Sequence, residues 1–276
     1  MLVDLDAAVI ANRRLSADYN VLSFDAAEIA ATARPGQFVM IKTSGGQDPL
    51  LRRPFSIFEI LRDRDGRPSG ISIFNKCIGA GTTLLSRVEP GTHVPVLGPL
   101  GRPFEPIDPP AEAWMVAGGV GLAPFITFAS ALASRQTKTT LFYGARRAEE
   151  LYCVELFEAL GVSTVLATED GSRGVHGRVT VPLHAALAAR PLGNPVKLFV
   201  CGPTPMMRAC AELAASHGRA CDVSLEQVMG CGLGGCYSCV VLARDGGSGK
   251  PHHTRTCVDG PVFDATRIVW DAASGH

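Results

Sequence analysis

Four of the chain's nine cysteines crowd near its C-terminus, where they follow the pattern Cys231-x4-Cys236-x2-Cys239-x17-Cys257. Three cysteines at these intervals, with a fourth further along, are typical of plant-type iron–sulfur proteins, in which four thiolates bind two irons. Four glycines between residues 230 and 235 allow the tight turns that a loop around a cluster needs. The pattern therefore predicts a 2Fe–2S cluster bound by these four cysteines.

The same four thiolates could instead bind a single structural zinc ion. Zinc ribbons usually contain two close Cys-x2-Cys pairs, whereas here three cysteines share one loop and the fourth stands alone on a later segment. This difference favours the iron–sulfur interpretation. The zinc alternative would make the chain a zinc-stabilised interaction module that carries no electrons.

The composition of the 276-residue chain narrows the classes of function. Lys and Arg total 26, as do Asp and Glu, so the net charge is zero, which argues against a nucleic-acid-binding protein. The N-terminal segment lacks the basic region of a secretory signal, so we expect a cytoplasmic protein whose cysteines form no disulfides. The uncharged stretch 113–134 is interrupted by glycines and Pro124, so we expect a strand, a loop and a helix there and no membrane span.

The elements that must position the cysteines differ along the chain. Up to about residue 105, short apolar stretches alternate with Gly- and Pro-containing turns, and this pattern predicts a small antiparallel β-barrel. Beyond it, strands and helices alternate, which predicts a parallel, doubly wound α/β sheet. The predicted strands are 38–41, 54–60, 71–74, 94–97, 114–117, 139–143, 163–167 and 196–201, and the predicted helices are 124–134, 148–160, 181–189 and 205–217.

Two short motifs in the barrel half could bind a phosphate-containing cofactor. Residues 53–56 have the sequence Arg-Pro-Phe-Ser on a predicted strand, and residues 79–82 have the sequence Gly-Ala-Gly-Thr before a short helix. Taken alone, the second motif is either a turn whose amides bind phosphate or an ordinary turn with a helix cap at Thr82. The two motifs together resemble the flavin domain of the ferredoxin–NADP reductase superfamily.

That resemblance implies an FAD site and a role for each motif residue. Arg53 would contact the flavin pyrophosphate, Phe55 would pack on the isoalloxazine ring, and Ser56 would lie near flavin N5. The family often has Tyr at the position of Phe55, so stacking is kept and a hydroxyl hydrogen bond is lost. The full set of implied FAD-binding residues is Arg53, Pro54, Phe55, Ser56, Gly79, Gly81 and Thr82.

A glycine-rich loop follows the first strand of the second half. Gly118, Gly119 and Gly121 would let the backbone approach a pyrophosphate, although tight packing between strand and helix would also require glycine. In the same superfamily this loop and a Cys-Gly-Pro turn frame the nicotinamide cofactor, and here Cys201 and Gly202 begin such a turn. The resemblance places Cys201 near the nicotinamide ring. The alternative for Cys201 is a small buried side chain with no further role.

Three other arginines could reach cofactor phosphates. Arg52 precedes the flavin motif, and Arg146 and Arg147 follow a predicted strand. Two arginines near the adenosine end of a nicotinamide cofactor could bind the 2′-phosphate of NADP. All three could equally be solvated surface charges, so the sequence does not decide whether the cofactor is NAD or NADP.

The order of the three modules resembles one family along nearly the whole chain. The order is a flavin barrel at 1–106, a nicotinamide domain at 107–221 and a 2Fe–2S domain at 222–276. Together with local matches at 53–57, 236–239 and 257–263, it resembles the electron-transfer subunits of type 1B dihydroorotate dehydrogenases. The fold class implied is an α+β multidomain protein with an antiparallel β-barrel, a doubly wound α/β domain and a small C-terminal cluster domain. The related subunits of electron-bifurcating oxidoreductases and sulfhydrogenases often have Gly where this chain has Tyr237, and this difference favours the dihydroorotate dehydrogenase family.

The resemblance implies an electron relay. A partner subunit that contains FMN would oxidise dihydroorotate in pyrimidine biosynthesis, and electrons would pass through the 2Fe–2S cluster and FAD to NAD⁺. The cofactors would carry the chemistry, so no catalytic acid, base or nucleophile is expected in this chain. The expected assembly is a hetero-oligomer with two of each subunit. The alternatives are a reductase subunit of an electron-bifurcating, sulfhydrogenase or oxygenase complex.

Overall fold

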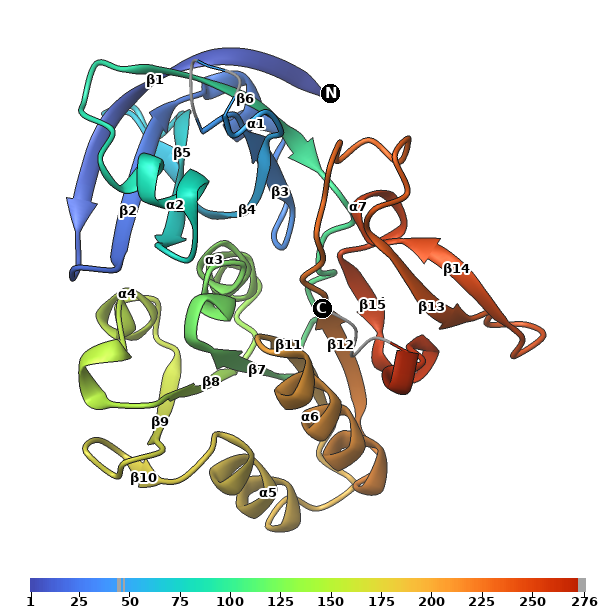
Figure 1. The fold of residues 1–276 in the computed structure, drawn as a ribbon. Helices are drawn as coiled ribbons and strands as arrows, with labels where there is room; N and C mark the ends of the chain where they lie inside the picture. The colour runs from blue at the N-terminus through green and yellow to red at the C-terminus, as the bar shows by residue number, and fades with distance from the viewer. Residues whose placement is uncertain (44–45, 47, 273–276) are drawn as a thin grey trace.

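The computed structural model describes residues 1–43, 46 and 48–272 of the chain. Three units follow one another, as Figure 1 shows: a barrel, a sheet flanked by helices, and a small C-terminal unit beside both. No helix within these ranges is both long and apolar enough to cross a lipid bilayer.

The N-terminal unit is a closed six-stranded barrel. Its strands follow the order β1-β2-β5-β4-β3-β6, and all its strand pairs are antiparallel, which confirms the predicted barrel. Alternate apolar side chains fill its interior, because successive residues of a strand point to opposite faces. Its elements are β1 (Val3–Arg14), β2 (Tyr19–Asp25), α1 (Ala27–Thr32), β3 (Phe38–Ile41), β4 (Arg53–Arg62), β5 (Pro68–Lys76), α2 (Ala80–Ser86) and β6 (His93–Leu100).

The second unit is built on a seven-stranded sheet of order β10-β9-β8-β7-β11-β12-β15. All its strand pairs are parallel except β12 with β15, which confirms the predicted parallel sheet. The elements are β7 (Glu112–Gly118), α3 (Phe125–Ser134), β8 (Thr139–Ala145), α4 (Val154–Glu158), β9 (Ser163–Thr168), β10 (Val175–His176), α5 (Thr180–Ala188), β11 (Val196–Cys201), α6 (Thr204–Ser216), β12 (Ala220–Ser224) and β15 (Val262–Asp264).

The two faces of this sheet are covered by different helices. On the central strand β7, Ala113, Met115 and Ala117 belong to the core that includes α3 and α4. Trp114 and Val116 point the other way and share a core with α5 and α6. Helices on both faces of a parallel sheet define the doubly wound arrangement that the sequence predicted.

Phe104 joins the barrel to the sheet. It follows the last barrel strand, is fully buried, and lies 5.5 Å from Phe125, 5.1 Å from Phe128 and 5.7 Å from Phe199, measured between ring centroids. Aromatic contacts of this kind add stability beyond the area that they bury. They fix the barrel against α3 and β11, which flank the space between the two units.

The C-terminal unit shares its core with the sheet. It contains a loop, the hairpin β13 (Val240–Arg244) and β14 (Pro251–Arg255), and α7 (Thr256–Asp259), and its strand β15 extends the large sheet. Side chains of the hairpin and of β15 pack with α6 and β12 in one core. Strand β12 runs across residues 221 and 222, so the two units are continuous in structure there.

The helix predicted at 148–160 is wrong in its extent. The structure has a 3-10 turn at Ala148–Glu150 and a separate short helix, α4. Between them, Cys153 adopts a positive φ of 58°, which a continuing right-handed helix cannot contain. The apolar pattern of this segment resembles a helix because Val154 and Phe157 are buried, but helical geometry is interrupted just before them.

Candidate functional site

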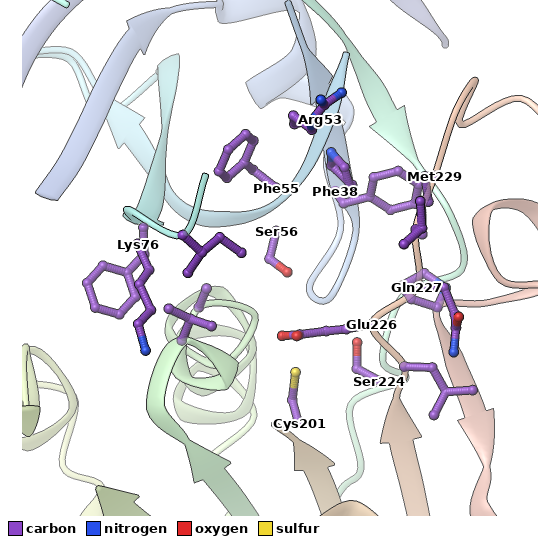
Figure 2. A pocket seen from close by; sticks show the side chains of 18 of the residues that line it. Phe38, Arg53, Phe55, Ser56, Lys76, Cys201, Ser224, Glu226, Gln227 and Met229 are labelled. Atoms are coloured by element: carbon purple, nitrogen blue, oxygen red, sulfur yellow. The ribbon is translucent and has the colours of Figure 1, made fainter. Parts of the chain in front are cut away.

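A cavity of about 540 Å³ lies between the barrel, the sheet and the segment that follows β12. Binding sites for small molecules and cofactors commonly have this size. Of the residues predicted from sequence, Arg53, Pro54, Phe55, Ser56, Thr82 and Cys201 line it. Figure 2 shows side chains of the barrel above this space and Cys201 below it.

The two neighbouring arginines at the start of β4 have different partners. Arg52 donates two hydrogen bonds to the carboxylate of Asp4, at 2.8 and 2.9 Å, so its charge is already paired. Arg53 donates to the backbone carbonyls of Leu51 and Arg52 and lines the cavity. The geometry therefore favours Arg53 over Arg52 as a ligand for an anionic group in the cavity.

Thr82 closes the turn between β5 and α2. Its hydroxyl accepts hydrogen bonds from the amides of Ile78 and Gly79, at 2.9 and 3.1 Å, and donates to the Gly79 carbonyl. The cap of α2 is Gly79 and Thr82 is its third helical residue, so the cap expected at Thr82 is misplaced, although Thr82 organises the turn and lines the cavity. A side chain on Gly79 would meet no atom within 4 Å, so its backbone is open to a ligand.

Gly81 packs against a threonine that the sequence analysis did not single out. A Cβ atom at Gly81 would lie 3.0 Å from Thr43 Oγ1 and 3.5 Å from Arg53 Cγ. Thr43 is 6% exposed, and its hydroxyl has no hydrogen-bond partner among the described residues. A buried, unpaired hydroxyl is costly unless a ligand satisfies it. Thr43, Gly81 and Arg53 thus fit the phosphate end of a dinucleotide, and no motif in the sequence marks Thr43.

A second cavity of about 410 Å³ adjoins the first along the carboxyl ends of β7 and β11. Gly118, Gly119 and Gly202 line it, as the sequence predicted for a nicotinamide cofactor. Gly121 lines neither cavity within the described residues. A Cβ atom there would collide with the backbone of Cys201 and Gly202, so Gly121 allows close packing between the loop and the end of β11.

The outer end of the second cavity carries charges of both signs. Arg146, Glu169 and Arg178 line it. Arg147 lies 3.5 Å from the carboxylate of Glu149 and is turned to the surface. Of the two arginines considered from sequence, only Arg146 is therefore among the cavity-lining residues described.

Glu226 stands where the two cavities meet, since it lines both of them. Glu226 is exposed to the solvent of the open site, and the surrounding protein still raises its pKa by partly desolvating its carboxyl group. Burial also raises the pKa of the Cys201 thiol well above its usual range, and the negative charge of Glu226 adds to that effect. Cys201 is therefore an uncharged thiol. A single Glu after a strand carries no distinctive signal, so no pattern in the sequence marks Glu226.

The four predicted cluster cysteines form two pairs. The pKa of Cys236 falls to about 6, through hydrogen bonds from Ser238 and then from Cys231. The pKa of Cys257 rises to about 12, mainly through burial and then through its neighbour Cys239. Cys236 is exposed, whereas Cys239 and Cys257 are each 1% exposed and pack against side chains of β3 and β6.

This paired arrangement fits a binuclear cluster. In a 2Fe–2S cluster each iron takes two cysteine ligands, and the pairs Cys231–Cys236 and Cys239–Cys257 supply them. A single zinc ion would require four ligands around one point. Within the described ranges, no three His, Cys, Asp or Glu side chains are placed to hold one metal ion. These pairings are compatible with the iron–sulfur prediction.

The cluster loop and the cavity wall belong to one stretch of chain. Residues 224–229 line the first cavity, and Cys231 follows two residues later. On the barrel side, Gly232 packs against Met40 and Leu100 with a positive φ of 72°, which requires glycine. The predicted cluster site and the predicted flavin site therefore share a wall.

Comparisons with known proteins agree with this arrangement of sites. Residues 115–212 match the family model "Oxidoreductase NAD-binding domain". Residues 226–269 match the model "Iron-sulfur cluster binding domain of dihydroorotate dehydrogenase B". These matches confirm the nicotinamide and iron–sulfur modules predicted from sequence.

Solved structures define the class of protein. The NADH-dependent reduced ferredoxin–NADP oxidoreductase of a flavin-based electron-bifurcation study superposes with a TM-score of 0.83 at 28% identity, covering 97% of this chain and 91% of that one. A ferredoxin–NADP⁺ reductase from Neisseria gonorrhoeae has a TM-score of 0.65 at 16% identity, covering 79% and 92%, and shows the same fold. The chain is thus a ferredoxin-reductase-type oxidoreductase with an added iron–sulfur domain.

Curated relatives identify the family within this class. The dihydroorotate dehydrogenase B (NAD⁺) electron transfer subunit of Desulforamulus reducens is 36% identical over 267 residues, which cover 96% of this chain and 98% of that one. The corresponding subunit of Geobacillus kaustophilus is 36% identical over 271 residues, covering 97% and 100%. The chain belongs to the family of dihydroorotate dehydrogenase B electron transfer subunits, and the resemblance stated from sequence is confirmed.

Proposed function

We propose that this chain carries electrons from an FMN-containing dihydroorotate dehydrogenase subunit to NAD⁺, through a 2Fe–2S cluster and FAD. The observation that carries the proposal is the wall shared by the cysteine loop and the first cavity, which runs from Ser224 to Cys231. A cluster bound there would lie beside a flavin bound in the cavity. Oxidation of dihydroorotate to orotate releases two electrons and two protons, and NAD⁺ takes up both electrons and one proton.

The bound cofactors would supply the electron and hydride transfers, and the protein would position them. Arg53 in the first cavity, together with Thr43 beside Gly81, would bind the flavin pyrophosphate, and Phe55 would pack on the ring. In the second, Gly118, Gly119 and Gly202 would let the backbone approach NAD⁺. Ser56 and Cys201 lie on opposite walls where the two cofactors would meet, and both line the first cavity. The neutral thiol of Cys201 would add no charge beside the positively charged nicotinamide.

The cluster would be bound by Cys231 and Cys236 on one iron and by Cys239 and Cys257 on the other. Cys236 is the exposed member of the set, so electrons would enter beside it. Around it lie exposed apolar side chains: Leu233 is 53%, Tyr237 61% and Val258 39% exposed. We propose that this patch contacts the FMN subunit. Exposed apolar residues that gather around a functional group are typical of interaction sites.

The proposal includes an assembly and a location. We propose that the complex contains two copies of each subunit and lies in the cytoplasm. Within this chain, we propose that residues 1–106 bind FAD, residues 107–221 bind NAD and residues 222–276 bind the cluster. The described cysteines are all free thiols, which is compatible with a reducing compartment. Native mass spectrometry of the purified complex and fractionation of the source cells test the stoichiometry and the location.

The decisive experiment is anaerobic co-purification of the tagged chain from its own cells. The eluate should contain FAD, a 2Fe–2S cluster and an FMN subunit, and it should form NADH from dihydroorotate and NAD⁺. The second candidate is a subunit of an electron-bifurcating complex, favoured by the 28% identical oxidoreductase structure. Intact flavin and cluster with no NADH formed would support that candidate, and the co-eluting subunit would then show the electron donor. A colourless chain that contains zinc would overturn both.

A further inference from the structure

Three asparagines form a chain of amide hydrogen bonds across the barrel. Asn75 on β5 donates to Asn20 on β2 at 2.7 Å, and Asn20 donates to Asn12 on β1 at 2.7 Å. Asn75 and Asn20 are 0% and 1% exposed, and Asn12 is half-buried. Buried polar groups are costly unless they are hydrogen-bonded. The three asparagines therefore occupy positions where apolar side chains would ordinarily pack.

Both ends of the amide chain bind the same short helix. At one end, the Asn75 amide donates to the carbonyl of Thr82 at 3.0 Å. At the other, the Asn12 amide donates to the carbonyls of Ser86 and Val88, at 3.2 and 2.8 Å. Helix α2 is therefore held at its beginning and just beyond its end by one continuous network. The free carbonyls at a helix end need such donors.

The segment held in this way lines the proposed flavin site. The first cavity is lined by Lys76 and Ile78, which follow Asn75 in the sequence. It is also lined by Thr82, whose carbonyl accepts a hydrogen bond from Asn75. Gly81 between them packs on Thr43 and Arg53. A shift of α2 along or away from the barrel would therefore separate Thr82 from Arg53 and widen the space between them.

We infer that Asn12, Asn20 and Asn75 are positioning residues for FAD, which set the place of the Gly79–Thr82 turn relative to Arg53. They do not line the cavity themselves within the described residues. Each amide in the series donates to the next acceptor, so the loss of one member leaves a buried group of its neighbour unpaired. The inference rests on the proposed function, because it requires that FAD binds in the first cavity.

The test compares FAD binding by the full-length holoprotein with that by three variants. Asn12→Ala removes the donors to Ser86 and Val88, and Asn12→Asp keeps the volume and the acceptor for Asn20 but also removes those donors. Ser72→Ala is the matched control. Ser72 lies on β5, is fully buried, and donates to Glu59 at 3.0 Å, away from α2. The dissociation constant for FAD, the melting temperature and the KM for NADH with ferricyanide as acceptor are measured for each.

Both Asn12 variants should raise the dissociation constant for FAD by about tenfold or more, because two hydrogen bonds to α2 are lost. KM for NADH with saturating FAD should stay unchanged. Ser72→Ala, with a similar loss of melting temperature, should leave FAD binding within about twofold of wild type. The inference would be overturned if the loss of FAD affinity were proportional to the loss of melting temperature in all three variants, Ser72→Ala included. Unchanged FAD affinity in the Asn12 variants would also overturn it. A wild-type chain that retains no FAD would overturn the proposed function and the inference with it.

Discussion

The carboxyl group of Glu226 and the thiol of Cys201 face the same space, at the junction of the two cavities. Glu226 lines both cavities and Cys201 lines the first. The charge on Glu226 contributes to the raised pKa of Cys201, and burial is the main cause of the shift in each residue. Two groups with raised pKa values, the buried thiol of Cys201 and the exposed carboxyl of Glu226, therefore lie where flavin and nicotinamide are proposed to meet.

The raised pKa of Glu226 makes a prediction about stability. An acid whose pKa is higher in the folded state than the ordinary value of about 4.5 binds more protons when folded. Its ionisation therefore destabilises the fold as the pH rises from that ordinary value through the raised one. Glu226→Gln removes this penalty, so the variant should melt at a higher temperature than wild type at pH 7, and the difference should shrink below pH 4.5.

Melting temperature measured across this pH range, on the flavin-free chain, checks the expectation. Glu89→Gln is a suitable control, because Glu89 lies in a turn of the barrel and lines neither cavity among the described residues. It should not reproduce the gain in melting temperature expected of Glu226→Gln at pH 7. A Glu226→Gln variant that is less stable than wild type at pH 7 would show that the carboxylate forms favourable contacts instead.

The neighbouring arginines of β4 should behave differently. Arg53→Gln should weaken FAD binding by about 10- to 100-fold, which corresponds to the ~1.5–3 kcal/mol of a charge-assisted hydrogen bond. Arg52→Gln removes a pair with Asp4 whose carboxylate is exposed, and such a pair is worth about 0–1 kcal/mol of stability. Titration of the two apoproteins with FAD, followed by flavin fluorescence, separates these outcomes. Equal loss of affinity in both variants would contradict the proposed pyrophosphate site.

The cysteine pairs predict a clean separation of activities. Cys236→Ser should abolish the EPR signal of the reduced cluster and reduce dihydroorotate-driven NAD⁺ reduction to background. It should leave NADH oxidation by ferricyanide near the wild-type rate, because the flavin and nicotinamide cavities do not include Cys236. Cys210→Ala serves as the control, because Cys210 is buried on α6 and lies outside the cluster loop and outside the residues that line the two cavities. Wild-type NADH formation by Cys236→Ser would exclude the relay through the cluster.

Local sequence patterns account for the modules of this chain. The cysteine spacing and the Gly-rich turns depend on a few neighbouring residues, so they are visible without the fold. The strand at 53–56 is equally local, since its alternation places Phe55 and Arg53 on one face. The barrel and the sheet follow from turn residues and from the strand–helix alternation.

Contacts between distant segments could not be predicted in this way. Thr43, which follows β3, meets Gly81 of α2 across a long stretch of sequence, and Asn12 reaches residues more than 70 positions away. Likewise, nothing near Glu226 in the sequence shows that it borders two cavities. The interruption of the predicted helix at Cys153 could not be predicted either, because one residue with a positive φ leaves the apolar pattern unchanged.

Tyr237 leads to a final prediction, because its backbone conformation lowers the stability of the chain whereas its side chain is proposed to strengthen binding of the FMN subunit. Its φ of 57° lies in the left-handed region, which costs a non-glycine residue about 1–2 kcal/mol. Its exposed ring lies 5.7 Å from the guanidinium of Arg255, which is paired with Asp259 and donates to the Gly234 carbonyl. The ring is thus held at the surface beside Cys236, at the expense of backbone strain.

Tyr237→Gly should therefore raise the melting temperature of the isolated chain and weaken its binding to the FMN subunit. An aromatic anchor at the centre of an interface contributes about 2 kcal/mol or more, or roughly thirtyfold in Kd. Calorimetric titration with the FMN subunit measures this loss, and an unchanged EPR signal shows that the cluster is intact. Leu192→Ala is the matched control, since Leu192 is 76% exposed on the loop before β11 and outside the cluster loop. If Leu192→Ala weakens the complex and Tyr237→Gly does not, the partner binds elsewhere and the strain at Tyr237 has another cause.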